Sequence, residues 1–267
     1  MSTIAIYARL VRLQVRSQLQ YTTNFLMSVL ATFLFTSLDL ATILVIFSNI
    51  RTLGGWTAQQ VLLLYGAAAS SYALADMLLG SLDRLPQLIR EGNFDSMLFR
   101  PRSPFFQLLA SDFMLSRGGR LAQSIIVVIV ICTVYIHIAW TAGAILVLTV
   151  AVISGAVILG AVWVAGACIS FWIEGAGEFV NTFSSGALFV TQYPLNIYAQ
   201  WLQATVTFII PIGFVIYMPT SYLLHKAPIF DMPSVLRLSS PLVAGAATAA
   251  AAALWRSSIR HYRSAGG

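Results

Sequence analysis

The sequence predicts an all-α integral membrane protein with six transmembrane helices, an N-terminal interfacial helix and an outer re-entrant helical pair before the last span. Composition is the first observation. Hydrophobic residues make up 58% of the 267 positions and charged residues only 9%, against about 25% charged residues in soluble domains. The second observation is that apolar residues form runs of about 20, the length that crosses the roughly 30 Å hydrocarbon core of a bilayer. Together they exclude a soluble or disordered chain.

The first helix of this architecture is expected over residues 1–22. Arg9, Arg12 and Arg16 share one face of a helix there, and apolar residues such as Leu10 occupy the other face. A helix of this kind lies in the plane of the membrane interface, with its arginines toward anionic headgroups. Two roles stay open: a membrane-surface anchor, and an elbow that also contacts a cytoplasmic partner.

Apolar runs long enough to be transmembrane helices occur at residues 24–50, 57–80, 121–140, 143–172 and 239–255. Tryptophans support these boundaries, because Trp56, Trp140, Trp172 and Trp255 all lie at run ends. Indole rings favour the membrane–water interface. We therefore expect these five runs to be spans.

Positive charge predicts the orientation of the spans. Of the 15 basic residues, 12 lie before the first run, after the last run or within residues 81–120, which share one side of the membrane. The other three, Arg51, Lys226 and Arg237, fall on the opposite side. Cytoplasmic loops carry the excess of arginine and lysine. Both termini and the 81–120 loop are therefore expected in the cytoplasm, which requires an even number of crossings.

Cytoplasmic termini leave one crossing for the stretch 178–224, which is apolar but interrupted by three prolines. We interpret 178–193 as the sixth crossing and 194–224 as a re-entrant pair of short helices. Backbone that turns inside a membrane must pack against protein or line a cavity. The alternative makes 199–222 the crossing and 176–194 an interfacial helix, and it also gives six spans.

The 81–120 loop contains an amphipathic segment with helical spacing. Its apolar face is Leu85, Leu88 and Ile89, and its polar face is Arg84, Gln87, Arg90 and Glu91. Gly92 can end this helix, and a second short stripe follows with Phe94, Met97 and Leu98 before Pro101. Such a segment fits either a docking element for a soluble partner or a helix lying flat on the membrane.

Two acidic residues fall inside expected spans: Asp39 near the middle of the first and Asp76 near the inner end of the second. A charged group in a bilayer is costly, so it usually faces the bundle interior or a wet cavity. Both are candidates for a substrate path or a subunit contact, and for Asp39 this is the role that we expect. For Asp76 the structural interpretation is favoured, in which it reaches the interface and meets Arg84. The structural alternative for Asp39 is a neutral carboxyl or one bonded to Ser37.

The run from Arg90 to Pro101, Arg-Glu-Gly-Asn-Phe-Asp-Ser-Met-Leu-Phe-Arg-Pro, resembles the cytoplasmic segment of ABC-2 type permeases. These are the membrane subunits of a class of ATP-driven transporters. The later Gln-Tyr-Pro at 192–194, with Trp201, Pro211 and Pro219, resembles the outer re-entrant helices of the same family. The resemblance covers nearly the whole chain, 1–267, as a single transmembrane domain. It is strongest to a subgroup often found as two related permeases working with one type of ATPase.

The resemblance implies a permease subunit of an exporter in a prokaryotic cell membrane. It implies a second permease, as a homodimer or a heterodimer, and a separate ATPase dimer that carries the ATP and Mg²⁺. The ATPase would bind the 81–120 loop at Arg84, Gln87, Leu88, Ile89, Arg90, Glu91, Phe94, Asp95 and Arg100. Leu88, Ile89 and Phe94 are expected to fill a cleft on the ATPase, with the charges setting register. No cofactor and no nucleic acid are expected on this chain.

The sequence carries no ATP-binding loop of its own. The motif G-x-x-x-x-G-K-[ST] is absent, and the only lysine, Lys226, follows Leu-Leu-His. No metal-ligand spacing and no nucleophile elbow occur either, which disfavours a membrane-embedded enzyme. A secondary transporter or channel is the main alternative, but such carriers usually show an internal repeat and more intramembrane polar groups.

Overall fold

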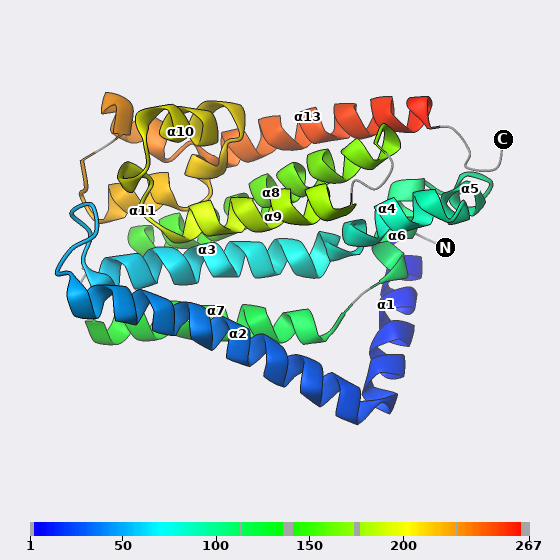
Figure 1. Cartoon of the computed structure of the whole chain (residues 1–267), viewed down its shortest axis with the longest axis horizontal. Coiled ribbons are helices and arrows are strands. Elements are labelled where there is room, and N and C mark those ends of the chain that lie inside the picture. Colours follow the sequence, from blue (N-terminus) through cyan, green and yellow to red (C-terminus); the bar gives the residue numbers. More distant parts are fainter. Residues whose placement is uncertain (1–2, 113, 136–140, 174–176, 228, 263–267) are drawn as a thin grey trace.

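The computed structural model of the chain describes residues 3–112, 114–135, 141–173, 177–227 and 229–262. All of the elements in these ranges are helices, and the longest of them lie side by side as a bundle (Figure 1). The all-α membrane class predicted from composition is therefore confirmed. Residues 136–140, which include the expected end of the third span at Trp140, and Arg263 of the last basic cluster lie outside the described residues.

Within the described residues, five helices are long and apolar enough to cross a membrane, and they match the five expected runs. They are α2 (Thr22–Asn49), α3 (Ala58–Leu79), α7 (Ser116–Val130) with its π-helical continuation η2 (Ile131–Tyr135), α8 (Ala142–Cys168) with η3 (Ile169–Phe171), and α13 (Ser240–His261). The α3 helix is buried over most of its circumference, as expected for a helix that is apolar all round. It packs between α7 on one side and α8 on the other.

The helix expected over residues 1–22 is α1 (Thr3–Gln20), which meets α2 at a sharp angle and lies across one end of the bundle (Figure 1). Arg9, Arg12 and Arg16 are exposed along it. Two glutamines attach α1 to the loop between α3 and α7. Gln14 Nε2 donates to the Ala110 carbonyl at 3.1 Å, and Gln18 Oε1 accepts from the Leu115 amide at 2.8 Å. This end of the bundle also carries the ends of α3 and α13.

The loop between α3 and α7 is almost entirely helical. It comprises η1 (Gly80–Arg84), α4 (Leu85–Arg90), α5 (Asn93–Leu98) and α6 (Pro104–Ser111). The backbone of Gly92 has φ +71°, a left-handed conformation that glycine adopts without strain. This turn ends α4, as the sequence predicts, and α5 begins directly after it.

The helix α9 (Gly177–Gln192) occupies the position expected for the sixth crossing. Its 16 residues span about 24 Å at 1.5 Å per residue, and it packs against α3 and α8. Gly177 begins it beside Pro86, at the end of the bundle that carries α4. Just beyond its other end, Asn196 Nδ2 donates to the Gly54 carbonyl at 2.6 Å, in the turn between α2 and α3. The chain therefore passes from one end of the bundle to the other.

The proline-interrupted stretch then folds as a bent pair. Its first arm is η4 (Leu195–Ile197), α10 (Gln200–Ala204) and η5 (Thr205–Ile209); its second is η6 (Ile212–Phe214) and α11 (Tyr217–Leu223), followed by η7 (Ile229–Asp231) and α12 (Ser234–Arg237). The arms meet at 78°. Lys226 Nζ donates to the Gly55 carbonyl at 2.7 Å. Since Asn196 and Lys226 both bind the same turn, the pair enters and leaves at one end, which favours the re-entrant arrangement over a crossing at 199–222.

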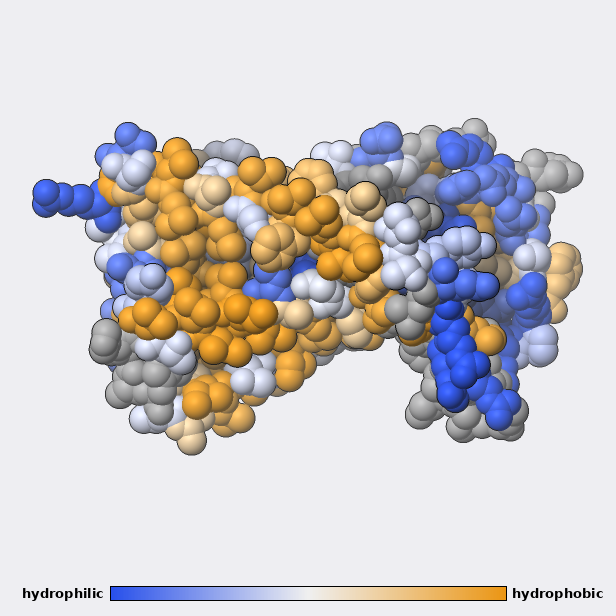
Figure 2. All heavy atoms as spheres, turned by 90° about the horizontal axis from the view of Figure 1, so that it is seen from below, coloured by the Kyte–Doolittle hydropathy of each residue, from blue (hydrophilic) through white to orange (hydrophobic). Residues whose placement is uncertain are grey.

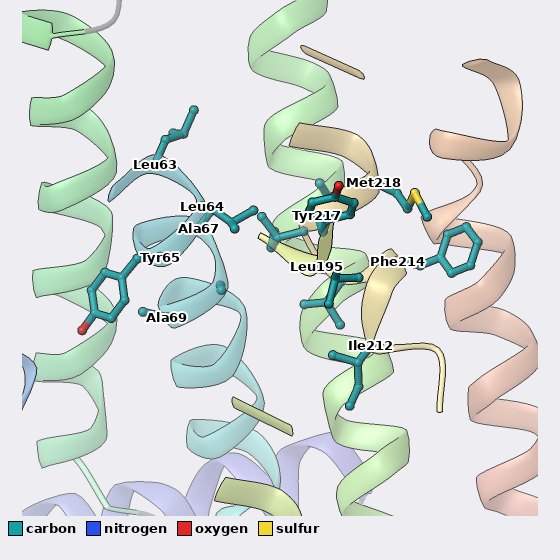
Figure 3. Packing of buried hydrophobic residues seen from close by; sticks show 14 of the residues in the cluster. Leu63, Leu64, Tyr65, Ala67, Ala69, Leu195, Ile212, Phe214, Tyr217 and Met218 are labelled. Atoms are coloured by element: carbon teal, nitrogen blue, oxygen red, sulfur yellow. The ribbon is translucent and has the colours of Figure 1, made fainter. Parts of the chain in front are cut away.

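Buried residues of the bent pair fix it to the spans (Figure 3). Leu195, Ile212 and Tyr217 pack toward α3 and α8 within one apolar cluster. Tyr65 projects from the opposite side of α3, away from the bent pair (Figure 3). The outer surface of the bundle is mainly hydrophobic on the face shown in Figure 2, and the end that carries α1 is hydrophilic. This distribution fits a bilayer around the body and water at that end.

Candidate functional site

The surface of α4 presents the polar residues that the sequence assigns to partner binding. Gln87, Arg90 and Glu91 are exposed, and half of the Arg84 side chain is exposed. Glu91 is held in place by two amides: Gln87 Nε2 donates to one carboxylate oxygen at 2.7 Å, and Asn93 Nδ2 donates to the other at 2.9 Å. The carboxylate is thus oriented in advance, so a cationic partner group would meet it with little loss of entropy.

The structure contradicts the role expected of Phe94. This side chain is fully buried, 5.4 Å from the Phe171 ring and 5.1 Å from the Tyr262 ring between centroids. It therefore cannot fill a cleft on another protein. The physical reason is the reversal at Gly92, which turns the apolar stripe of α5 toward the bundle. Leu88 and Ile89 are half-buried against the same cluster, so they contribute only part of their surface to any partner.

Phe99, which the sequence analysis did not single out, is the exposed aromatic of this segment. It is 90% exposed, and the neighbouring Leu98 is 40% exposed. At 100° per residue, position 99 lies about 140° around the helix from position 94. The helical spacing could therefore have indicated Phe99, because a helix that turns Phe94 inward turns Phe99 toward the outside. The exposed Arg100 follows it and adds positive charge to the same tip.

Asp95 lies on the inward side of α5 rather than at the tip. It is half-buried. Burial and the adjacent Asp95 carboxylate raise the pKa of Tyr262 to about 12. Asp95 thus lies beside Tyr262, the residue that follows α13, within its own chain.

Asp76 is the centre of a buried charge network. Its Oδ1 lies 3.1 Å from Arg117 Nε and its Oδ2 lies 3.3 Å from Arg120 Nη1. The carboxylate is nearly buried and Arg117 is only 14% exposed. Arg117 and Arg120 are three residues apart, so both project from the same face of α7. A Cβ at Gly80 would collide with the Arg117 guanidinium, and glycine at this position leaves space for the pair.

The structural interpretation in which Asp76 meets Arg84 is wrong in its partner. Arg84 Nη1 instead lies 3.8 Å from Asp112 Oδ1, near the surface. The η1 turn carries Arg84 away from the body of α3, whereas α7 returns along α3 and brings its own arginines to Asp76. Sequence spacing could not reveal this pairing, because it joins residues 41 and 44 positions apart.

The network extends to a third span through aromatic rings. The Arg120 guanidinium lies over the Tyr72 ring, 5.7 Å from its centroid, and Tyr72 stacks on Trp163 at 5.5 Å. Trp163 Nε1 donates to Asp83 Oδ1 at 2.8 Å. Helices α3, α7 and α8 and the η1 turn are therefore connected at the end of the bundle next to α4.

Asp39 is half-buried on α2. The Tyr65 hydroxyl lies 3.4 Å from Asp39 Oδ2 and also 3.4 Å from the Thr36 carbonyl, so it can donate to either. Ser37, the partner considered in the sequence analysis, instead accepts from Gln123 Nε2 at 3.3 Å. Asp39 thus has a weak neutral partner within its own chain, on a helix whose outer surface is largely exposed. Among the described residues, no group of His, Cys, Asp and Glu is arranged to hold a metal ion.

These helices define a multi-pass, all-α membrane protein. Residues 33–266 match the family described as ABC-2 family transporter protein. Because the match spans most of the chain, the protein belongs to this family and is a permease, the membrane subunit of an ABC transporter. Family membership confirms the resemblance seen at residues 90–101 and decides against a secondary transporter or channel. Comparisons with curated proteins and with solved structures gave no match.

Proposed function

We propose that this permease is driven by a separate ATPase dimer that docks on the α4–α5 segment, and that the complex is an exporter. The observation that carries the proposal is Phe99, a large aromatic side chain that is 90% exposed beside Arg100. Aromatic and arginine side chains dominate binding energy at protein interfaces. Glu91, Arg90 and Gln87 flank this contact and set its register.

Docking at this place gives a physical route for coupling. The α4 helix follows α3 through the short η1 turn, so a displacement of α4 moves the inner end of α3. Asp76 on α3 then carries that movement to α7 through Arg117 and Arg120. Closing of two ATPases would in this way reach several spans at once. ATP and Mg²⁺ are assigned to the partner, because a phosphate-binding loop needs a lysine. The one lysine of this sequence, Lys226, binds Gly55 at the opposite end of the bundle.

Purification tests this function directly. Affinity-tagged permease, extracted from native membranes in a mild detergent, should retain a second polypeptide with a phosphate-binding loop. The retained complex should hydrolyse ATP in a vanadate-sensitive manner. A permease that purifies without any ATPase under several mild conditions would contradict the proposal.

The orientation proposed here is that both termini and the α4–α6 loop are cytoplasmic. Cysteines introduced at the exposed positions Thr52 and Val235 should react with a membrane-impermeant thiol reagent in intact cells. Cysteines at Ser96 and Ser257 should react only after the membrane is opened. The two native cysteines are buried and should add little background. Labelling of a cysteine at position 257 in intact cells would contradict the proposed orientation.

We also propose that α2 faces the second permease and that Asp39 lies at this contact or at a path beside it. A half-buried carboxyl on a lipid-facing helix is unfavourable, and a partner would cover it. Leu38 is 62% exposed next to Asp39. A photo-crosslinking amino acid at position 38 should give an adduct of permease size. The same amino acid at Leu242, 78% exposed on α13 at the opposite edge of the bundle (Figure 1), should give lipid adducts only. Lipid adducts alone from position 38 would refute the contact.

A further inference from the structure

A large apolar groove runs along the outside of α8, between α3 and α13. Its volume is about 860 Å³, within the roughly 300–1,000 Å³ range of ligand pockets. The floor is formed by small residues of α8, including Ala156 and Gly160. Leu78 of α3 and Ala252 of α13 stand on its two sides, and α6 closes one end with Phe105. The groove therefore lies within the membrane-spanning part, in the half next to the docking segment.

The rim of the groove near α6 is polar. Arg256 is the charged residue among the described residues that line the groove, and Ser103 lies at the same end. Both side chains are exposed. Arg256 has no ion-pair partner in the described part of the chain. The site thus combines a long apolar body with one uncompensated positive charge at the level of the interface, where Trp255 also lies.

We propose that this groove binds an anionic phospholipid, with an acyl chain along α8 and the phosphate at Arg256. Lipid is the solvent for an open groove at this depth, and arginine near the cytoplasmic interface attracts anionic headgroups. A second copy of the chain fits less well. A two-fold contact through this face would bring the two Arg256 side chains, and the nearby Arg260 side chains, toward each other.

Bound lipid would also touch the support of the docking segment. Phe105 and Trp255 line the groove and stack edge-to-face at 5.0 Å. Trp255 in turn contacts Phe171, which packs on Phe94. An acyl chain in the groove therefore fills space behind the aromatic cluster that seats α5. Binding itself does not depend on the proposed ATPase; only the assignment to the cytoplasmic leaflet depends on the proposed orientation.

Native mass spectrometry of the purified full chain, with phosphatidylglycerol or phosphatidylcholine added to the detergent, tests the site. Phosphatidylglycerol should be retained in preference to phosphatidylcholine. Arg256→Gln should weaken phosphatidylglycerol binding about tenfold, the effect of losing one charge-assisted hydrogen bond. Arg260→Gln, at an exposed position on the same helix outside the groove, should have little effect. Equal losses from both variants would show a diffuse basic surface and overturn the site.

The acyl-chain part of the proposal has its own pair of variants. Ala252→Phe places a ring in the groove and should reduce binding of both lipids. Ala250→Phe is the matched control, because Ala250 is exposed on α13 but does not line the groove. Unchanged lipid binding in Ala252→Phe would overturn the proposal. Conversion of a dimer to a monomer by Ala252→Phe would show instead that a second copy occupies the groove. Because no ATPase is present, failure here would not bear on the docking of the ATPase.

Discussion

Replacing Phe99 with aspartate should abolish binding of the ATPase while leaving the fold of the permease intact. The side chain is 90% exposed, so the folded permease loses almost no packing. At the docked interface the same change removes an aromatic anchor and buries a charge without a partner. A loss of at least about 2 kcal/mol is typical of such an anchor, or roughly 30-fold in Kd. Co-purification of the two proteins and the melting temperature of the free permease measure the two effects separately.

Three further variants make this result specific. Phe99→Leu keeps an apolar group and should retain most of the binding. Val235→Asp makes a similar change at a 77% exposed residue near the opposite end of the bundle and should leave binding unchanged. Phe94→Ala should instead lower the melting temperature of the free permease. Removing a fully buried aromatic side chain costs about 3–5 kcal/mol of stability. Normal ATPase binding by Phe99→Asp would show that the tip of α5 is not the docking surface.

Asp76→Asn should be among the most destabilising conservative changes in this chain. It leaves Arg117, which is 14% exposed, and Arg120 without their carboxylate. Breaking a buried ion pair on one side costs about 3–5 kcal/mol, because an uncompensated charge stays buried. The Asp76→Asn, Arg117→Gln double variant should recover part of this loss. Thermal unfolding of the purified permease in detergent is the measurement.

Asp39→Asn is the matched control for the Asp76 variant. It makes the same chemical change in a neighbouring span, but Asp39 is half-buried and accepts its hydrogen bond from the neutral Tyr65 hydroxyl at 3.4 Å. Its melting temperature should therefore stay close to that of the unmodified permease. Equal destabilisation by the two variants would mean that the ion pairs of Asp76 add nothing beyond a buried polar group.

The spans could be predicted from the sequence because lipid imposes a one-dimensional rule. Twenty apolar residues must form a helix in a bilayer, and the five runs became α2, α3, α7, α8 and α13. The short α9 and the bent pair were predictable from proline positions together with the distribution of arginine. Gly92 was predictable as a helix end because a reversal there needs a left-handed residue.

The partners of individual side chains were not predictable in the same way. An amphipathic pattern shows that α4 and α5 each have an apolar face, but it does not say what that face contacts. The pattern assigned Phe94 to a partner, whereas the chain buries it against Phe171 and its own C-terminal helix. Asp76 likewise pairs with two arginines of α7, because α3 and α7 pack together although they are far apart in the sequence. The groove along α8 depends on three helices at once, so no local pattern reveals it.

A photo-crosslinking amino acid at position 99, activated in intact cells, tests the docking of an ATPase most directly. The same amino acid at Val235 provides the control at the opposite end of the bundle. Irradiation should give one major protein adduct at position 99, and mass spectrometry should identify it as a polypeptide with a phosphate-binding loop. The control position should give no such adduct. Adducts at position 99 that contain only lipid would show that the α4–α5 segment lies on the membrane surface and that the permease is driven from another contact.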